Sequence, residues 1–171
     1  MGLLSRLLGN DRAAKARAEK AGAPGASQQP PPVTFDPGLI ARLKDDHREL
    51  LRTFGAARTA ITESRFGDIA HLLSHFRQAF RAHIATEAAR LYPYLQQRVA
   101  RDAEAAALLA QAHREMNEIA FEVLQVVDAY LAHPPTHLNE GQFQYDIERV
   151  SALLAQRVQQ VEARLYPLYH A

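Results

Sequence analysis

The sequence predicts an all-α fold, an antiparallel up-down-up-down four-helix bundle with a flexible N-terminal tail. Four segments carry apolar residues at alternating spacings of three and four, the period of an amphipathic helix. The connections between them are short, which favours antiparallel neighbours, and no segment alternates with the period of two that a strand requires. A chain of 171 residues with 47% hydrophobic content is large enough for one such domain with a buried core.

A basic tail and a linker are expected over residues 1–35. Residues 21–34 combine Gly, Ser, Gln and four prolines, a composition that neither nucleates a helix nor supplies a core. Residues 1–20 hold five basic and two acidic residues and a few leucines, so they are predicted to make at most a weak contact with a membrane surface or a protein. No apolar run approaches the roughly 20 residues that span a bilayer, and the first eight residues lack the pattern of a secretory signal. A cytoplasmic location is expected.

The first two helices have separate start signals, and the bundle is expected over residues 36–171. Asp36 as N-cap, with Pro37 at the first helical position, begins a helix predicted to run to about residue 63. Gly67 and Asp68 open a second helix that extends to about residue 97. Pro93 is predicted to kink the final turns of this helix, because proline interrupts the helical hydrogen bonds.

The last two helices also have recognisable ends. Asp102 caps the third helix, and Pro134 and Pro135 terminate it. Asn139, with Gln142 three residues later, predicts a capping box for a fourth helix that reaches nearly to residue 171. The four predicted helices then account for the whole domain.

Four polar side chains occupy positions where the inward stripes of three helices would otherwise carry apolar residues. They are His47 on the first helix, His83 and Glu87 on the second, and His113 on the third. A carboxylate among phenylalanines loses hydration and needs a cation, a proton or several hydrogen-bond donors. One metal ion would satisfy all four side chains, so the pattern predicts a metal inside the bundle.

Several other classes of protein are excluded by what the chain lacks. The sequence has no cysteine, which leaves imidazole and carboxylate as the metal ligands. It contains no G-x-S-x-G elbow, phosphate-binding glycine loop or H-E-x-x-H motif, so we expect a protein that is not an enzyme. It also has neither a concentrated basic patch nor a stacking motif, and no nucleic-acid partner is expected.

The second and fourth helices share an internal repeat. The eleven residues from His83 to Pro93 align with those from Arg157 to Pro167, and five positions are identical. His47 and His113 each lie in the helix that precedes one copy. The repeat therefore predicts two helical hairpins, related by an approximate two-fold axis, that contribute ligands to a shared core site.

With these motifs, residues 36–171 resemble the hemerythrin and hemerythrin-like (HHE cation-binding) family of non-haem di-iron four-helix bundles. The resemblance rests on Asp46-His47-Arg48-Glu49-Leu50, His83-x-x-x-Glu87 with Leu91-Tyr92-Pro93, His113, and Leu165-Tyr166-Pro167. It implies two iron ions bridged by carboxylates, reversible binding of dioxygen or a related small molecule, or iron and redox sensing. Carried over residue by residue, His47, His83, Glu87 and His113 match ligand positions.

The fourth helix departs from the family pattern. Arg157 stands where the family usually has its last histidine, and Val161 stands where a glutamate follows four residues later. Glu162 matches the spacing of the hemerythrins proper, whose bridging carboxylate follows the histidine by five residues. Those proteins also have a histidine at the position of Leu109. One iron could keep a two-His, two-carboxylate set of ligands, namely His47, His83, Glu87 and Glu162.

The incomplete motif leaves two hypotheses open. In the first, the chain binds non-haem iron, as one or two ions in an incomplete di-iron site, and carries or senses dioxygen, nitric oxide or redox state. In the second, it is a metal-free interaction scaffold whose basic tail docks it to a partner. Arg157 would then replace the charge of the metal by pairing bidentately with Glu87 or Glu162.

Overall fold

The computed structural model describes residues 33–170, and the predicted contact of residues 1–20 lies outside this range. The chain forms α2 (Leu39–Thr62), α3 (Phe66–Thr86), the π-helical turn η1 (Glu87–Leu91), α4 (Tyr92–Arg98), α5 (Ala103–Ala132), α6 (Glu140–Arg164) and the 3-10 turn η2 (Tyr166–Leu168). None of the helices in residues 33–170 has the length and apolar character needed to cross a membrane.

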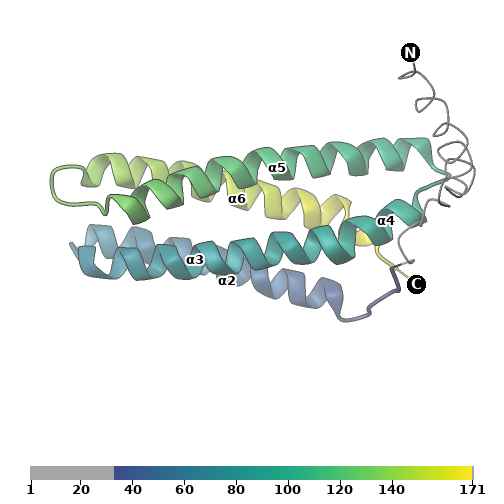
Figure 1. Cartoon of the computed structure of the whole chain (residues 1–171), viewed down its shortest axis with the longest axis horizontal. Helices are drawn as coiled ribbons and strands as arrows, with labels where there is room; N and C mark the ends of the chain where they lie inside the picture. The colour runs from purple at the N-terminus through teal and green to yellow at the C-terminus, as the bar shows by residue number, and fades with distance from the viewer. Residues whose placement is uncertain (1–32, 171) are drawn as a thin grey trace, which may run out of the picture. The chain divides into compact units, whose positions relative to one another are not determined.

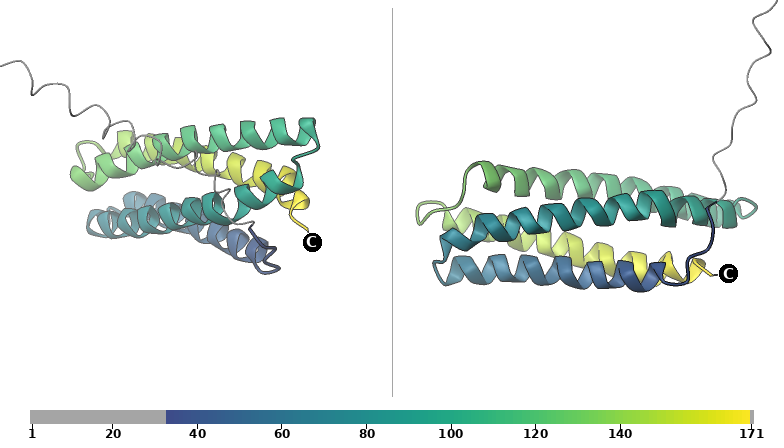
Figure 2. Two further views of the ribbon diagram at one scale, coloured as in Figure 1. Left: turned by 45° about the vertical axis from the view of Figure 1, so that its right-hand side comes forward. Right: turned by 60° about the horizontal axis from the view of Figure 1, so that its bottom comes forward.

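The four long helices run alternately up and down, as Figure 1 shows, so the predicted all-α four-helix bundle is confirmed. Helix α2 packs against α3 and α6, and α5 packs against the same two helices. The two views in Figure 2 show the same ring of neighbours, with α3 continuing through η1 into α4 before the chain turns back along α5. Consecutive helices are thus antiparallel, as short connections favour.

The core consists of two apolar clusters separated by a polar layer. The phenylalanine cluster contains Phe54, Phe76, Phe80 and Phe143, and Phe54 packs edge-on against Phe76 with ring centroids 4.2 Å apart. The terminal cluster lies at the end of the bundle where α2 begins and α6 ends, and it contains Leu43, Leu91, Leu95, Val161 and Leu165. Between the clusters, α2, α3 and α6 each bury a polar residue: His47, His83 and Arg157. The polar layer therefore has packed apolar walls on both sides.

Helix α2 begins two residues later than predicted. The N-cap is Gly38, and Asp36 instead forms a turn in which its Oδ1 accepts the Gly38 N–H at 3.0 Å. The Asp36 carbonyl also accepts the Leu39 N–H at 3.1 Å. Aspartate commonly bonds to the backbone two residues ahead in this way, and the sequence does not distinguish that turn from a helix cap.

The predicted caps of α5 and α6 have different outcomes. Asp102 caps α5 as predicted, because its carboxylate accepts a backbone N–H of the first turn at 3.0 Å. Asn139 is the N-cap residue of α6 as predicted, but the capping box is not formed, since the Asn139 side chain accepts the Thr136 N–H at 2.7 Å instead. Helix α6 also ends earlier than predicted, at Arg164, and Pro167 lies in the 3-10 turn that follows.

A π-helical turn lies just ahead of the predicted kink. In η1 the Tyr92 N–H bonds to the carbonyl of Glu87, five residues back. Pro93 lacks an N–H and crowds the carbonyl four residues before it, and a wider turn ahead of the proline accommodates both effects. Glu87 therefore sits where the helix widens, and such turns are frequent at functional sites.

Candidate metal centre

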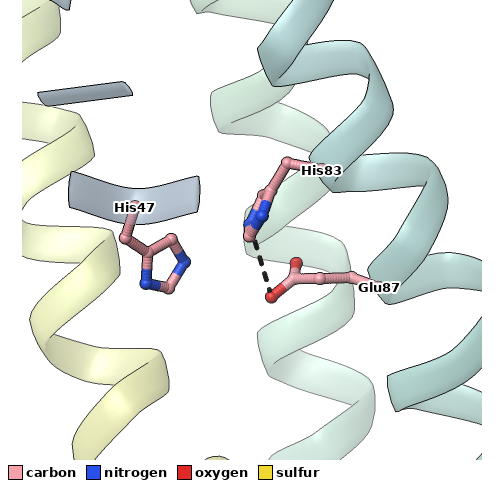
Figure 3. A group of neighbouring side chains, drawn as sticks. All are labelled: His47, His83 and Glu87. Carbon is pink, nitrogen blue, oxygen red and sulfur yellow. Dashed lines mark ion pairs between the residues drawn. The ribbon is translucent and has the colours of Figure 1, made fainter. Parts of the chain in front are cut away.

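Three of the five sequence-predicted ligands meet in the polar layer. His47 of α2, His83 of α3 and Glu87 of η1 each offer a ligand atom, and these three atoms lie within 4.8 Å of one another. Figure 3 shows both imidazoles and the carboxylate turned toward a common point, with His83 Nε2 3.7 Å from Glu87 Oε1. The spacing of four residues places His83 and Glu87 on one helix face, and the antiparallel packing of α2 on α3 adds His47.

A carboxylate holds the outer nitrogen of each imidazole. His47 Nδ1 lies 2.8 Å from Glu162 Oε1, and His83 Nδ1 lies 3.3 Å from Asp46 Oδ2. A carboxylate on Nδ1 makes that nitrogen the hydrogen-bond donor and leaves Nε2 unprotonated, which is the form that binds metal. In Figure 3 the Nε2 of His47 faces His83 and Glu87. Glu162, expected as a ligand, is thus placed behind His47 as its hydrogen-bond partner.

Burial favours the neutral form of all three groups in the metal-free protein. Loss of hydration lowers the pKa of His47, against the opposing effect of the Glu162 hydrogen bond. Loss of hydration also lowers the pKa of His83, against the charge of Glu87. The pKa of Glu87 is raised by burial, although His83 and Arg157 act in the other direction. The lowered pKa keeps both histidines neutral at neutral pH, and neutral imidazole is the form that binds metals.

Glu87 has no hydrogen-bond partner within residues 33–170. The residue is 1% exposed, and neither carboxylate oxygen has a hydrogen-bond partner among the described residues. A buried carboxylate in this state requires a proton or a cation. Two imidazoles and one carboxylate are typical ligands of non-haem Fe(II) and also occur at zinc sites. The residues present therefore fit a divalent cation.

Arg157 is buried beside these ligands but forms no ion pair with either predicted carboxylate. Its Nη2 donates to the hydroxyl of Tyr92 at 2.8 Å, and its Nε has no partner among the described residues. Glu162 is instead engaged by His47 at 2.8 Å and by Lys44 at 3.7 Å. The bidentate pair predicted from the sequence is not formed: Glu162 is held by His47 and Lys44, and Arg157 donates to the Tyr92 hydroxyl while its Nε stays unpaired within residues 33–170.

His113 lies outside the group of ligands. It is half-buried on α5, and its ring packs against that of Tyr92 with centroids 4.5 Å apart. Ala112 takes the inward position in its place. Both positions fit the alternating spacing between Leu109 and Met116, and one residue corresponds to about 100° of helical rotation. The sequence pattern alone did not distinguish them.

A small cavity adjoins the ligands. Arg157 lines it together with His47, His83 and Glu87, and most of the remaining wall is apolar. Its volume, measured for the centre of a water-sized sphere, is about 20 Å³. That space admits about one water-sized molecule. The cavity can therefore hold a metal ion's small ligand but no large substrate.

Two residues at the site were not predicted from the sequence. Asp46 orients His83, and its only sequence signal was its place directly before His47. The Tyr166 ring lies parallel to that of His47 at 5.8 Å, with its hydroxyl 3.4 Å from Nε2. Tyr166 and Tyr92 are the tyrosines of the two Leu-Tyr-Pro copies, so the repeat places one tyrosine beside His47 and the other beside Arg157.

The contribution of the two carboxylates that hydrogen-bond the imidazoles should be measurable as a change in metal affinity. Asp46→Asn and Glu162→Gln should each weaken binding of a divalent cation by about 10–100-fold, the usual cost of losing such a partner. Competition titration against a chromophoric chelator gives the affinities. Asp45→Asn is the matched control, because Asp45 is exposed and pairs with Arg48 on the surface. Equal affinities in all three variants would contradict the orienting role.

One comparison with known proteins found a match. The family model of the hemerythrin HHE cation binding domain matches residues 38–169, a range that includes all four helices and the polar layer. No curated protein and no solved structure matches the chain.

Proposed function

The chain belongs to the hemerythrin HHE cation-binding family, and from this premise we propose that it binds one iron ion through His47, His83 and Glu87. The unpaired carboxylate of Glu87 carries this proposal, because it is buried and faces two neutral imidazoles. No surrounding residue in the described part of the chain places a positive charge in contact with the Glu87 carboxylate. A divalent cation would supply that charge.

One ion is favoured over two by the side chains of α5 and α6. A second ion needs ligands from these helices, and α6 presents Arg157 and Val161 at its buried positions. His113 of α5 packs on Tyr92 instead of joining the ligands. The permanent charge of Arg157 also disfavours a second cation nearby.

The site is suited to a small-molecule carrier or sensor, for dioxygen, nitric oxide or redox state. Bound iron would supply an open coordination position and redox chemistry. The surrounding residues do the rest: Asp46 and Glu162 orient the imidazoles, and the apolar wall limits access of water. The cavity has room for a water-sized molecule only, which supports a binding role over catalysis. The metal-free scaffold receives less support, because Arg157 forms no ion pair with Glu87 or Glu162.

Metal content tests the proposal. Untagged protein produced in iron-supplemented medium should contain about one iron per chain by mass spectrometry, without the absorption band of an oxo-bridged pair. His83→Ala should contain almost none. An exposed histidine of the same helix provides the control, because His75→Ala should keep its iron. Two irons per chain, or negligible iron in the unmodified protein, would overturn the proposed site.

A further inference from the structure

We infer that the side chain of Arg157 is a gate, which closes a passage between α5 and α6 and lets a metal ion enter or leave only when it moves aside. This inference rests on the proposed function, because the passage leads to the ion that His47, His83 and Glu87 are proposed to bind. It concerns the rates at which the ion is bound and released, whereas the proposed function concerns the bound ion itself.

The first argument is the position of Arg157 between a buried space and the surface. The residue lines the small cavity at the metal ligands, and it also lines two crevices between α5 and α6. Of the described residues, it is the one that lines all three. The larger crevice measures about 240 Å³ against about 20 Å³ for the cavity, so it holds several waters where the cavity holds one. Arg157, which is 5% exposed, therefore forms the wall between them.

The second argument is that few contacts hold the Arg157 side chain in place. Its Nη2 donates a hydrogen bond to the hydroxyl of Tyr92, and its Nε has no partner among the described residues. Tyr92 is a phenol and carries no charge at neutral pH, so this contact is not an ion pair. A buried guanidinium without a charged partner gains hydration when it turns outward, and the crevice offers the carboxylate of Glu115 as well.

The third argument is the distribution of charge along the passage. Glu115 and Glu118 line the larger crevice, whereas the basic Arg164 lines only the smaller one. Glu87 lies at the inner end. Carboxylates at both ends attract a divalent cation, and the permanent charge of Arg157 between them repels it. An ion should therefore collect at the larger crevice and pass inward only when the guanidinium turns away, and the same barrier delays release.

The cavity has another side through which an ion could pass, between α2 and α6. Leu51 of α2 and Val158 of α6 line the cavity there and are only partly buried. Both side chains are apolar, so an ion on this route loses its hydration without meeting a carboxylate. The route past Arg157 is therefore favoured, and Val158→Ala tests the alternative.

The release of cobalt(II) measures the gate, because the visible absorption of this metal changes when it leaves the protein. Cobalt-loaded protein is mixed with chelator at concentrations that no longer affect the rate. Arg157→Ala should release cobalt at least about tenfold faster, which corresponds to a barrier lower by about 1.4 kcal/mol. Arg157→Met is the matched control, because methionine removes the charge but keeps a long side chain. It should release cobalt no faster than the unmodified protein, since less repulsion acts on the bound ion.

The outcomes separate the gate from the proposed function. Failure of the unmodified protein to bind cobalt would overturn the metal site, and the gate with it. Normal cobalt binding with equal release rates in Arg157→Ala and Arg157→Met would overturn the gate alone. Release from Val158→Ala as fast as from Arg157→Ala would also overturn it, because the ion would then leave between α2 and α6.

If Arg157→Ala does not fold, the outer end of the passage provides the test. Glu115→Gln combined with Glu118→Gln should load cobalt about two- to tenfold more slowly at low salt, because the charges that attract the ion are lost. Glu104→Gln combined with Glu140→Gln changes the net charge equally in the first turns of α5 and α6, and it should load cobalt at the normal rate. Equal loading rates in the two double variants would overturn the passage between α5 and α6.

Discussion

Replacement of Glu87 by glutamine should lower the affinity for a divalent cation by more than about 100-fold. Loss of a carboxylate that only orients a ligating histidine already costs about 10–100-fold, and Glu87 is proposed to bind the metal directly. Glu87 is the one carboxylate among the three candidate ligands, and it lies at the start of the π-helical turn with no hydrogen bond to either oxygen within residues 33–170. Glutamine keeps the shape of the side chain but offers a neutral oxygen. The affinity therefore falls mainly through the loss of charge.

The same substitution should stabilise the metal-free protein. A neutral amide costs less to bury than an unpaired carboxylate, so we expect the free energy of unfolding to rise by about 1–3 kcal/mol at neutral pH. The gain should depend on pH. Since burial raises the pKa of Glu87, the folded protein binds this proton more tightly than the unfolded chain, and stability is lost as pH rises above 4.5, the ordinary value. The advantage of glutamine should therefore be smallest below pH 4.5.

Denaturant unfolding of chelator-treated protein measures this effect. Glu162→Gln is the control, because Glu162 is 30% exposed and bonded to His47, so its replacement should weaken metal binding without stabilising the fold. A Glu87→Gln variant that binds metal as the unmodified protein does, or that unfolds more easily when metal-free, would show that Glu87 is not an unsatisfied ligand.

The four-helix fold was predictable because its signals are repeated along the chain. Each helix has apolar residues on one face over several turns, so a single misassigned residue does not change which face is predicted to be buried. His47, His83 and Glu87 were predictable for the same reason, since each lies between residues that are buried in the two apolar clusters. Leu43 and Leu50 flank His47, and Phe80 and Leu91 flank the pair on the next helix.

The remaining site residues depended on rotation and on competition between partners, which a single sequence does not specify. Ala112 and His113 differ by about 100° around α5, and packing placed alanine inside. Glu162 lies beside the buried Val161 and reaches His47 from a partly exposed position. The partner of Arg157 likewise depends on how the helices pack. The guanidinium donates to the hydroxyl of Tyr92 and not to the carboxylate predicted from the sequence.

The double substitution Arg157→His with Val161→Glu should raise the metal content from about one to about two ions per chain. Both positions are buried on α6 and line the cavity with His47, His83 and Glu87, so the new side chains would face the existing ligands. The change removes a permanent positive charge and adds a carboxylate that two cations can share. It also removes the hydrogen bond that holds Tyr92, against which His113 packs.

Mass spectrometry of protein saturated with iron or cobalt gives the ratio of metal to chain. The neutral control is Arg157→Gln with Val161→Gln, which removes the same positive charge but adds neither an imidazole nor a carboxylate, and it should remain at about one ion. Two ions in the first variant and one in the control would show that the residues of α6 alone limit the number of bound ions to one. Saturation at one ion in both would contradict this prediction and place the limit on α5, because His113 would then still be packed on Tyr92 and out of reach of a second ion.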